Sequence, residues 1–236
     1  MKRKRSSVLS DPVVEKILRE RRKYRIVDVF LELEKIYETG ELLRKRLRNR
    51  FRRAIFEVLD TGRRKGRILD LGTTFGMCGM GIAKQSHDFE ITSFQESKKY
   101  VEISRKFAGE DLVRMNWKIG KPEELPFEDE SFDIIVSAFD LHTWDNPLKV
   151  LREIDRVLRK KGKVVILDVR RDRWWFFYLP SLFYTCFVGG LWLFKRTKFA
   201  FKSSYKPNEI GKLLDFLKLE GWEIEEGSYY FLVRKQ

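Results

Sequence analysis

The chain has 236 residues, of which 43% are hydrophobic, so it is long enough to bury the core of one α/β domain with additions. Its two cysteines, Cys78 and Cys186, lie far apart, which argues against a disulfide framework and favours a cytoplasmic setting. The basic residues 2–5 are followed by no apolar stretch, so we expect no secretory signal.

The net charge of +14 is concentrated near the N-terminus. Residues 1–67 hold 22 Lys and Arg against 10 Asp and Glu, a net charge of +12, which leaves +2 for the rest of the chain. An electrostatic partner is therefore expected at this end, and both nucleic acid and anionic lipid headgroups fit it. The alternative is a solvated, salt-bridged helical face.

Two helices are expected in this basic region. Asp11 followed by Pro12 predicts a helix start, with Asp11 as the N-cap and Pro12 at the first helical position. Apolar residues keep helical spacing to residue 37, where Thr39-Gly40 interrupts them, and a second helix is predicted over 41–59. We therefore predict a basic helical region over 1–62 and a second domain over 63–236.

The stretch 67–84 predicts a buried strand, a glycine turn and a helix. Such a turn offers backbone N–H groups to a cofactor, although an ordinary strand–helix turn has the same pattern. Beyond it strands and helices alternate, which predicts an α/β fold with a doubly wound, mostly parallel sheet. The later strands are expected at 89–94, 113–119, 132–138, 163–169, 221–225 and 229–233, and the later helices at 98–108, 147–158 and 208–219.

From about residue 66 onward, apart from one insert, the chain resembles the class I S-adenosylmethionine-dependent methyltransferases. The residues Ile-Leu-Asp-Leu-Gly at 68–72 resemble the first motif of that family, and Leu125–Ser137 resembles its "LPF-x-D-x-SFD" run. Leu141-His142 lies where the family often has an "LHH"-like segment, and 148–165 resembles its "L-x-E-x-x-R-V-L" helix and fifth strand. The resemblance implies a seven-stranded, Rossmann-like methyltransferase fold whose last two strands form an antiparallel hairpin at the edge.

By the same resemblance the cofactor is S-adenosylmethionine. Asp70 would hold its ammonium group, Gly72 would let the backbone approach its methionine part, and Gly76 would open the helix behind it. Ser137, on the fourth strand, belongs to the same predicted site. Asp70 also suits a second role, in which it caps the turn by hydrogen bonds.

Three positions depart from the family pattern. Thr74 replaces the middle glycine of the turn, where a positive φ is costly for a side chain. Gln95 aligns with the acidic residue that holds the ribose hydroxyls, and Glu96 is the neighbour that would substitute for it. At the adenine edge the usual Asp is Lys121, and Pro122 has no N–H to donate. Each lost hydrogen bond costs about 1 kcal/mol, which predicts a weakened cofactor site.

An apolar insert, 174–194 within the broader segment 172–204, separates the fifth strand from the last helix. It has 21 residues without a charge, and Arg and Lys flank it on both sides. Its length suits a membrane span, but a single crossing would separate the last two strands from their sheet, and Pro180 and Gly189-Gly190 interrupt a helix. We expect peripheral contact with the inner face of the membrane through this insert. A lid over a soluble apolar substrate and a homo-oligomer contact are the alternatives.

Methyl transfer from a sulfonium requires alignment of the acceptor more than acid–base chemistry. His142 is the predicted base if the acceptor loses a proton, and Asp140 is the next candidate. The alternative for His142 is a hydrogen-bonded structural histidine. Two histidines and two scattered cysteines offer no ligand spacing, so no metal site is predicted.

These features lead to three functional hypotheses. The first is a methyltransferase that acts at a membrane surface on a lipid, quinone or other apolar small molecule. The second is an RNA methyltransferase whose basic N-terminal helices follow the phosphates, although the insert lacks the basic–aromatic interleaving of a single-strand groove. The third is a non-catalytic scaffold with the methyltransferase fold.

Overall fold

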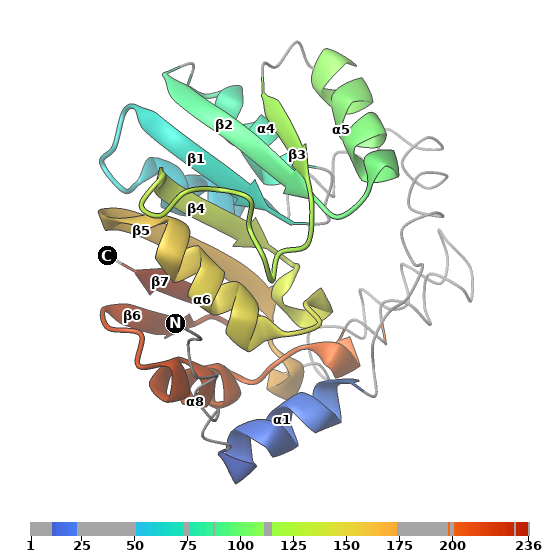
Figure 1. The fold of residues 1–236 in the computed structure, drawn as a ribbon, viewed down its shortest axis with the longest axis vertical. Coiled ribbons are helices and arrows are strands. Elements are labelled where there is room, and N and C mark those ends of the chain that lie inside the picture. Colours follow the sequence, from blue (N-terminus) through green and yellow to red (C-terminus); the bar gives the residue numbers. More distant parts are fainter. Residues whose placement is uncertain are drawn as a thin grey trace, which may run out of the picture.

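The computed structural model describes residues 11–22, 51–72, 76–86, 88–110, 115–173, 198, 201–228 and 230–235 (Figure 1). Its strands are β1 (Gly66–Leu71), β2 (Phe89–Gln95), β3 (Asn116–Ile119), β4 (Phe132–Ala138), β5 (Leu158–Val169), β6 (Trp222–Glu226) and β7 (Tyr230–Lys235). They form one seven-stranded sheet in the order β3-β2-β1-β4-β5-β7-β6. The first five strands run parallel, and β7 lies antiparallel between β5 and β6, which confirms the predicted fold and edge hairpin.

Helices cover both faces of this sheet. The helices are α1 (Pro12–Arg22), α4 (Met77–Ala83), α5 (Lys98–Glu110), α6 (Pro147–Val157) and α8 (Pro207–Leu217), with 3-10 turns η1 (Leu141–Thr143) and η2 (Arg171–Arg173). Residues 51–59 are also helical. Figure 1 shows α6 across the near face of the sheet, with α8 and α1 next to each other beyond it.

Successive side chains of each strand alternate between the two faces of the sheet, so the core consists of two apolar clusters, one on each face. Ile68 packs with α4, α5 and the helical residues 51–59, whereas the next residue, Leu69, packs with α1, α6 and α8. Successive side chains of a strand point to opposite faces, so a continuous apolar run such as that of β4 serves both layers. This two-sided burial fixes the carboxyl ends of β1, β4 and β5 next to one another.

Several predicted boundaries hold and one is wrong. The Asp11 carboxylate accepts hydrogen bonds from the amides of Val13 (2.7 Å) and Val14 (3.3 Å), which confirms it as the cap of α1. The fifth strand, predicted from 163, begins at Leu158 instead, directly after α6. The reason is that Leu158 already pairs with Phe132 and the pairing then shifts before Ile134, so residues 159–162 form an irregularity within the strand rather than a turn.

Some predictions fall on residues outside the described ranges. These are the continuation of the first helix to residue 37, residues 41–50 of the second, the start of the third strand, Thr74 and all of 174–194. The boundary at residue 62 stays a prediction. Among the residues that are described, no helix is long and apolar enough to cross a membrane.

Candidate active site

The glycine turn after β1 is built around a buried carboxylate. Asp70 is 3% exposed, and its Oδ2 accepts a hydrogen bond of 2.6 Å from the amide of Gly79 in α4. Burial raises the pKa of Asp70 to about 7, and the hydrogen bond from Gly79 opposes that shift. The side chain thus fastens the first turn of α4 to the end of β1, the capping role predicted as an alternative.

A second buried aspartate, Asp140, leaves no space for a side chain at position 72. A Cβ at Gly72 would lie 2.0 Å from Oδ2 of Asp140, which is 1% exposed and follows β4. A real side chain is impossible at that distance unless the backbone or the carboxylate moves. The structure therefore brings together Gly72 and Asp140, two residues that the sequence placed in the cofactor site and the catalytic site respectively.

Gly76 and Gln95 meet through Ser93. Gly76 has φ +70°, and a Cβ there would lie 2.8 Å from Oγ of Ser93. Gln95 donates from Nε2 to the same oxygen at 2.8 Å and is 1% exposed. The ends of β1 and β2 and the turn before α4 are therefore in direct contact.

Two orphaned polar atoms mark this part of the fold. Oε1 of Gln95 and Oγ of Ser137 are buried and have no hydrogen-bond partner among the residues that the structure describes. Such atoms are costly unless a ligand or water satisfies them. Both belong to residues that the sequence assigned to the cofactor.

The remaining predicted cofactor residues that the structure describes, Glu96, Lys121 and Pro122, follow β2 or β3. The Gly120 amide donates to the Gln95 carbonyl at 3.0 Å, which places Lys121 beside the end of β2. Lys121 and Glu96 are exposed, whereas Pro122 is buried.

His142 is held by an aspartate that the sequence analysis missed. Its backbone N donates to Oδ2 of Asp168 at 2.9 Å, and its Nδ1 lies 2.9 Å from Oδ1 and 3.0 Å from Oδ2 of the same residue. Asp168 is completely buried in β5. The available signal was an acidic residue near the carboxyl end of an otherwise apolar strand, Val-Val-Ile-Leu-Asp-Val.

The turn from β4 into this region is strained. Phe139 has φ +63°, a conformation that L side chains rarely adopt, and its amide donates to the Leu167 carbonyl at 2.7 Å. Backbone strain of this kind persists only where the surroundings enforce it, and it clusters at functional sites. The strained residue immediately precedes Asp140 and was not foreseen from the sequence.

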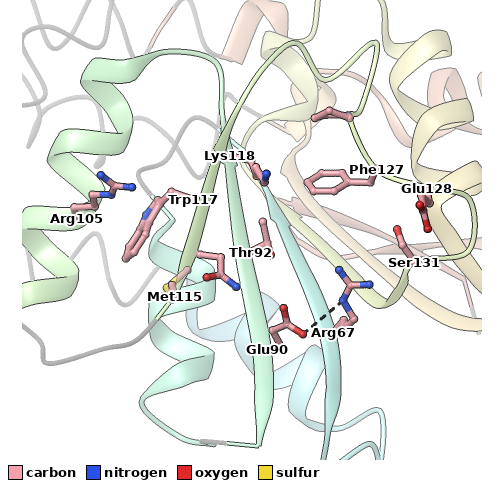
Figure 2. A pocket seen from close by; sticks show the side chains of 12 residues that line it. Arg67, Glu90, Thr92, Arg105, Met115, Trp117, Lys118, Phe127, Glu128 and Ser131 are labelled. Atoms are coloured by element: carbon pink, nitrogen blue, oxygen red, sulfur yellow. Dashed lines mark ion pairs between the residues drawn. The ribbon is translucent and has the colours of Figure 1, made fainter.

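A groove of about 710 Å³ lies elsewhere, on the face of β1–β3 (Figure 2). Its walls include the ion pair of Arg67 and Glu90 (3.6 Å), the Trp117 ring beneath Arg105, and Phe127 from the loop before β4. Of the predicted site residues that the structure describes, none lines it.

Comparison with known proteins identifies the family to which the chain belongs. A family model described as a methyltransferase domain matches residues 69–166. A demethylmenaquinone methyltransferase from Thermotoga maritima is 30% identical over 176 residues, which cover 71% of this chain and 74% of that protein. A ubiquinone/menaquinone biosynthesis C-methyltransferase from Geotalea daltonii is 34% identical over 135 residues, covering 53% and 57%.

Solved structures share the fold. A SAM-dependent methyltransferase from Aquifex aeolicus aligns with a TM-score of 0.57 at 19% identity, over 76% of this chain and 87% of that one. The plantazolicin methyltransferase BpumL, in complex with a monoazolic desmethylPZN analogue and SAH, aligns with a TM-score of 0.68 at 14% identity, over 95% and 99%. With these matches in sequence and fold, the chain belongs to the class I S-adenosylmethionine-dependent methyltransferases, and S-adenosylmethionine is its cofactor.

Proposed function

We propose that this methyltransferase acts on an apolar, quinone-type acceptor at a membrane surface. The observation that carries the proposal is the His142–Asp168 pair beside Asp140, because it supplies a proton acceptor next to the predicted cofactor site. The names of the relatives from Thermotoga and Geotalea support the acceptor class. The apolar residues 174–194 and the basic N-terminal region support the location.

The described residues fit the cofactor electrostatically. S-adenosylmethionine supplies a methyl group on a positively charged sulfonium, and it also carries an ammonium group. Three buried aspartates, Asp70, Asp140 and Asp168, follow one another across the ends of β1, β4 and β5. Buried carboxylates favour a cationic ligand, because each needs a nearby positive charge or hydrogen-bond donors.

Within the proposal each residue has a role. Asp70 and Gly72 hold the amino-acid end of the cofactor, Gly76 keeps the turn open, and the free polar atoms of Gln95 and Ser137 supply hydrogen bonds. The ribose hydroxyls are assigned to Gln95 and its neighbour Glu96, and the adenine edge to Lys121 and Pro122, whereas Thr74 lies outside the described residues.

The acceptor must gain a methyl group and lose one proton. His142 takes that proton on Nε2, since Asp168 occupies its Nδ1, and the buried Asp140 is the second candidate. The residues around β4 and η1 contribute orientation and exclude water, which are the main demands of this reaction.

Transfer of a labelled methyl group tests the acceptor. The purified chain is incubated with methyl-labelled S-adenosylmethionine and either vesicles that contain chemically reduced demethylmenaquinone or total RNA. We expect label in the quinol fraction, and the His142→Gln variant should transfer at least about ten times more slowly. Label in RNA alone would overturn the quinone assignment and favour the RNA alternative.

Vesicle flotation tests the location separately. The full chain should float with anionic vesicles, and a variant lacking 174–194 should not, while cofactor binding by calorimetry confirms that the shortened chain is folded. Equal flotation of the two proteins would show that the insert is not needed for membrane binding. Absence of flotation for both would refute the membrane location.

A further inference from the structure

Two backbone N–H groups and one imidazole nitrogen converge on the carboxylate of Asp168. Its Oδ2 accepts from the His142 amide at 2.9 Å, and its Oδ1 accepts from the Val169 amide at 2.7 Å. The third group is Nδ1 of His142, which lies within 3.0 Å of both oxygens. Because Asp168 is 0% exposed, water does not compete for these bonds.

This arrangement requires an acceptor on both sides of the side chain. An ionised carboxylate offers two acceptor oxygens, whereas an amide offers one oxygen and one NH₂ group. An asparagine would direct its NH₂ group against either the Val169 amide or the His142 side. The site therefore selects an aspartate over an asparagine, in a place where burial makes a charge costly.

The carboxylate also determines the state of the imidazole. A neutral histidine has one protonated nitrogen, and the hydrogen bond made by that nitrogen decides which tautomer is present. With Nδ1 facing an acceptor-only group, the proton belongs on Nδ1 and the lone pair on Nε2. The same carboxylate holds the backbone of η1, so it fixes both the position of the ring and its tautomer.

We propose that Asp168 is a positioning residue that presents Nε2 of His142 to the methyl acceptor. The inference rests on the proposed function, in which His142 takes the proton released by the acceptor. It places an element of the reaction on the buried part of β5, where residues 164–167 contribute apolar side chains to the core.

The ring nitrogens give a readout that does not depend on turnover. The chain has only two histidines, His87 and His142, so ¹⁵N spectra of the imidazoles are simple to assign with the His142→Gln variant. At a pH where the rings are neutral, we expect His142 in the wild type to be protonated on Nδ1. A proton on Nε2 in the wild type would overturn the proposal without any further variant.

The Asp168→Asn variant should lose this tautomer preference and reduce kcat roughly ten-fold or more, with KM for the cofactor within about two-fold. Thr61→Val is the matched control: it removes an Oγ1 bond to the Val58 carbonyl (2.7 Å) at the end of the helical residues 51–59 and touches none of the imidazole contacts. It should keep both the tautomer and kcat close to wild type.

The two proposals fail in different ways. An unchanged tautomer in a folded Asp168→Asn protein refutes the positioning role, whatever the rate. A changed tautomer together with normal turnover of the His142→Gln variant supports the positioning of the ring and refutes its role as the base, which is part of the proposed function.

Discussion

At the scale of single residues, the carboxyl end of the sheet gathers negative charge in a buried place. Asp70 fastens α4, Asp140 fills the space beside Gly72, and Asp168 holds His142. Burial together with Asp70 and Asp140 also keeps the pKa of the buried Cys78 thiol well above its usual value, so this thiol stays protonated. Within the proposed function, the cationic cofactor binds beside these carboxyl groups.

Gly72→Ala tests the close approach. The new Cβ would lie 2.0 Å from the Asp140 carboxylate, so we expect the dissociation constant for S-adenosylmethionine to rise at least about ten-fold by calorimetry. Gly109→Ala is the control, because no described residue lies within 4 Å of the new Cβ in α5, and alanine favours a helix by about 1 kcal/mol. Unchanged affinity in a folded Gly72→Ala protein would contradict the close approach.

The raised pKa of Asp70 predicts a pH dependence of stability without cofactor. Its pKa is 3.8 when exposed and about 7 in the fold, so the folded state binds the proton more tightly. The contribution of Asp70 to stability is therefore complete below pH 3.8 and is lost as the pH rises through 7, with a total change on the order of a few kcal/mol.

Asp70→Asn should flatten this dependence. Urea denaturation at pH 5 and pH 8 measures the difference in unfolding free energy for wild type and variant. Asp215→Asn, an exposed position on α8, should retain the wild-type difference. An equal difference in Asp70→Asn would show that this carboxyl is not the titrating group.

At the scale of elements, two of the stretches that carry the family resemblance, the loop before β4 and the helix α6, are joined by hydrogen bonds. Arg156 in α6 donates to the carbonyls of Leu125 (3.0 Å) and Phe127 (2.9 Å) and to both carboxylate oxygens of Glu153. Glu153 in turn accepts from the Leu125 amide at 2.8 Å. These hydrogen bonds join the "LPF" run at 125–127 to α6. The same contacts therefore explain why both stretches of the family resemblance have the residues they have.

Arg156→Met should lower the unfolding free energy by about 2–4 kcal/mol, because it removes a donor from two carbonyls and the cationic partner from the partly buried Glu153 carboxylate. Denaturant unfolding measures this loss. Arg152→Met, exposed on the same helix, should stay within about 0.5 kcal/mol of the wild type. Similar losses in the two variants would mean that the loop is held in another way.

At the scale of the whole molecule, the N-terminal helix is tied to the chain that follows the apolar insert. Arg21 of α1 is 8% exposed and donates to the carbonyls of Lys202 (2.6 Å) and Ser204 (3.0 Å). Burial lowers the pKa of Arg21, and nearby Arg171 acts in the same direction. The first described helix therefore packs where the chain returns from the insert to α8.

Arg21→Gln should lower the unfolding free energy by about 1–3 kcal/mol and increase hydrogen exchange of residues 201–206, since it weakens both bonds. Mass spectrometry of exchanged peptides measures the second effect. Arg19→Gln, exposed on α1, should change neither quantity. Unaltered exchange in Arg21→Gln would show that α1 does not hold residues 201–206 in place.

The sequence by itself determined the order of strands and helices, the family, and the residues at the turn after β1. These follow from local signals: apolar runs, glycines, and caps such as Asp11, each of which acts within a few neighbours. Only the tertiary structure decided that Asp140 fills the space beside Gly72, that Phe139 takes a positive φ, and that Asp168 holds His142 from 26 residues away. The reason is physical: these contacts join different strands, and they exist only once the parallel sheet has brought the strand ends together.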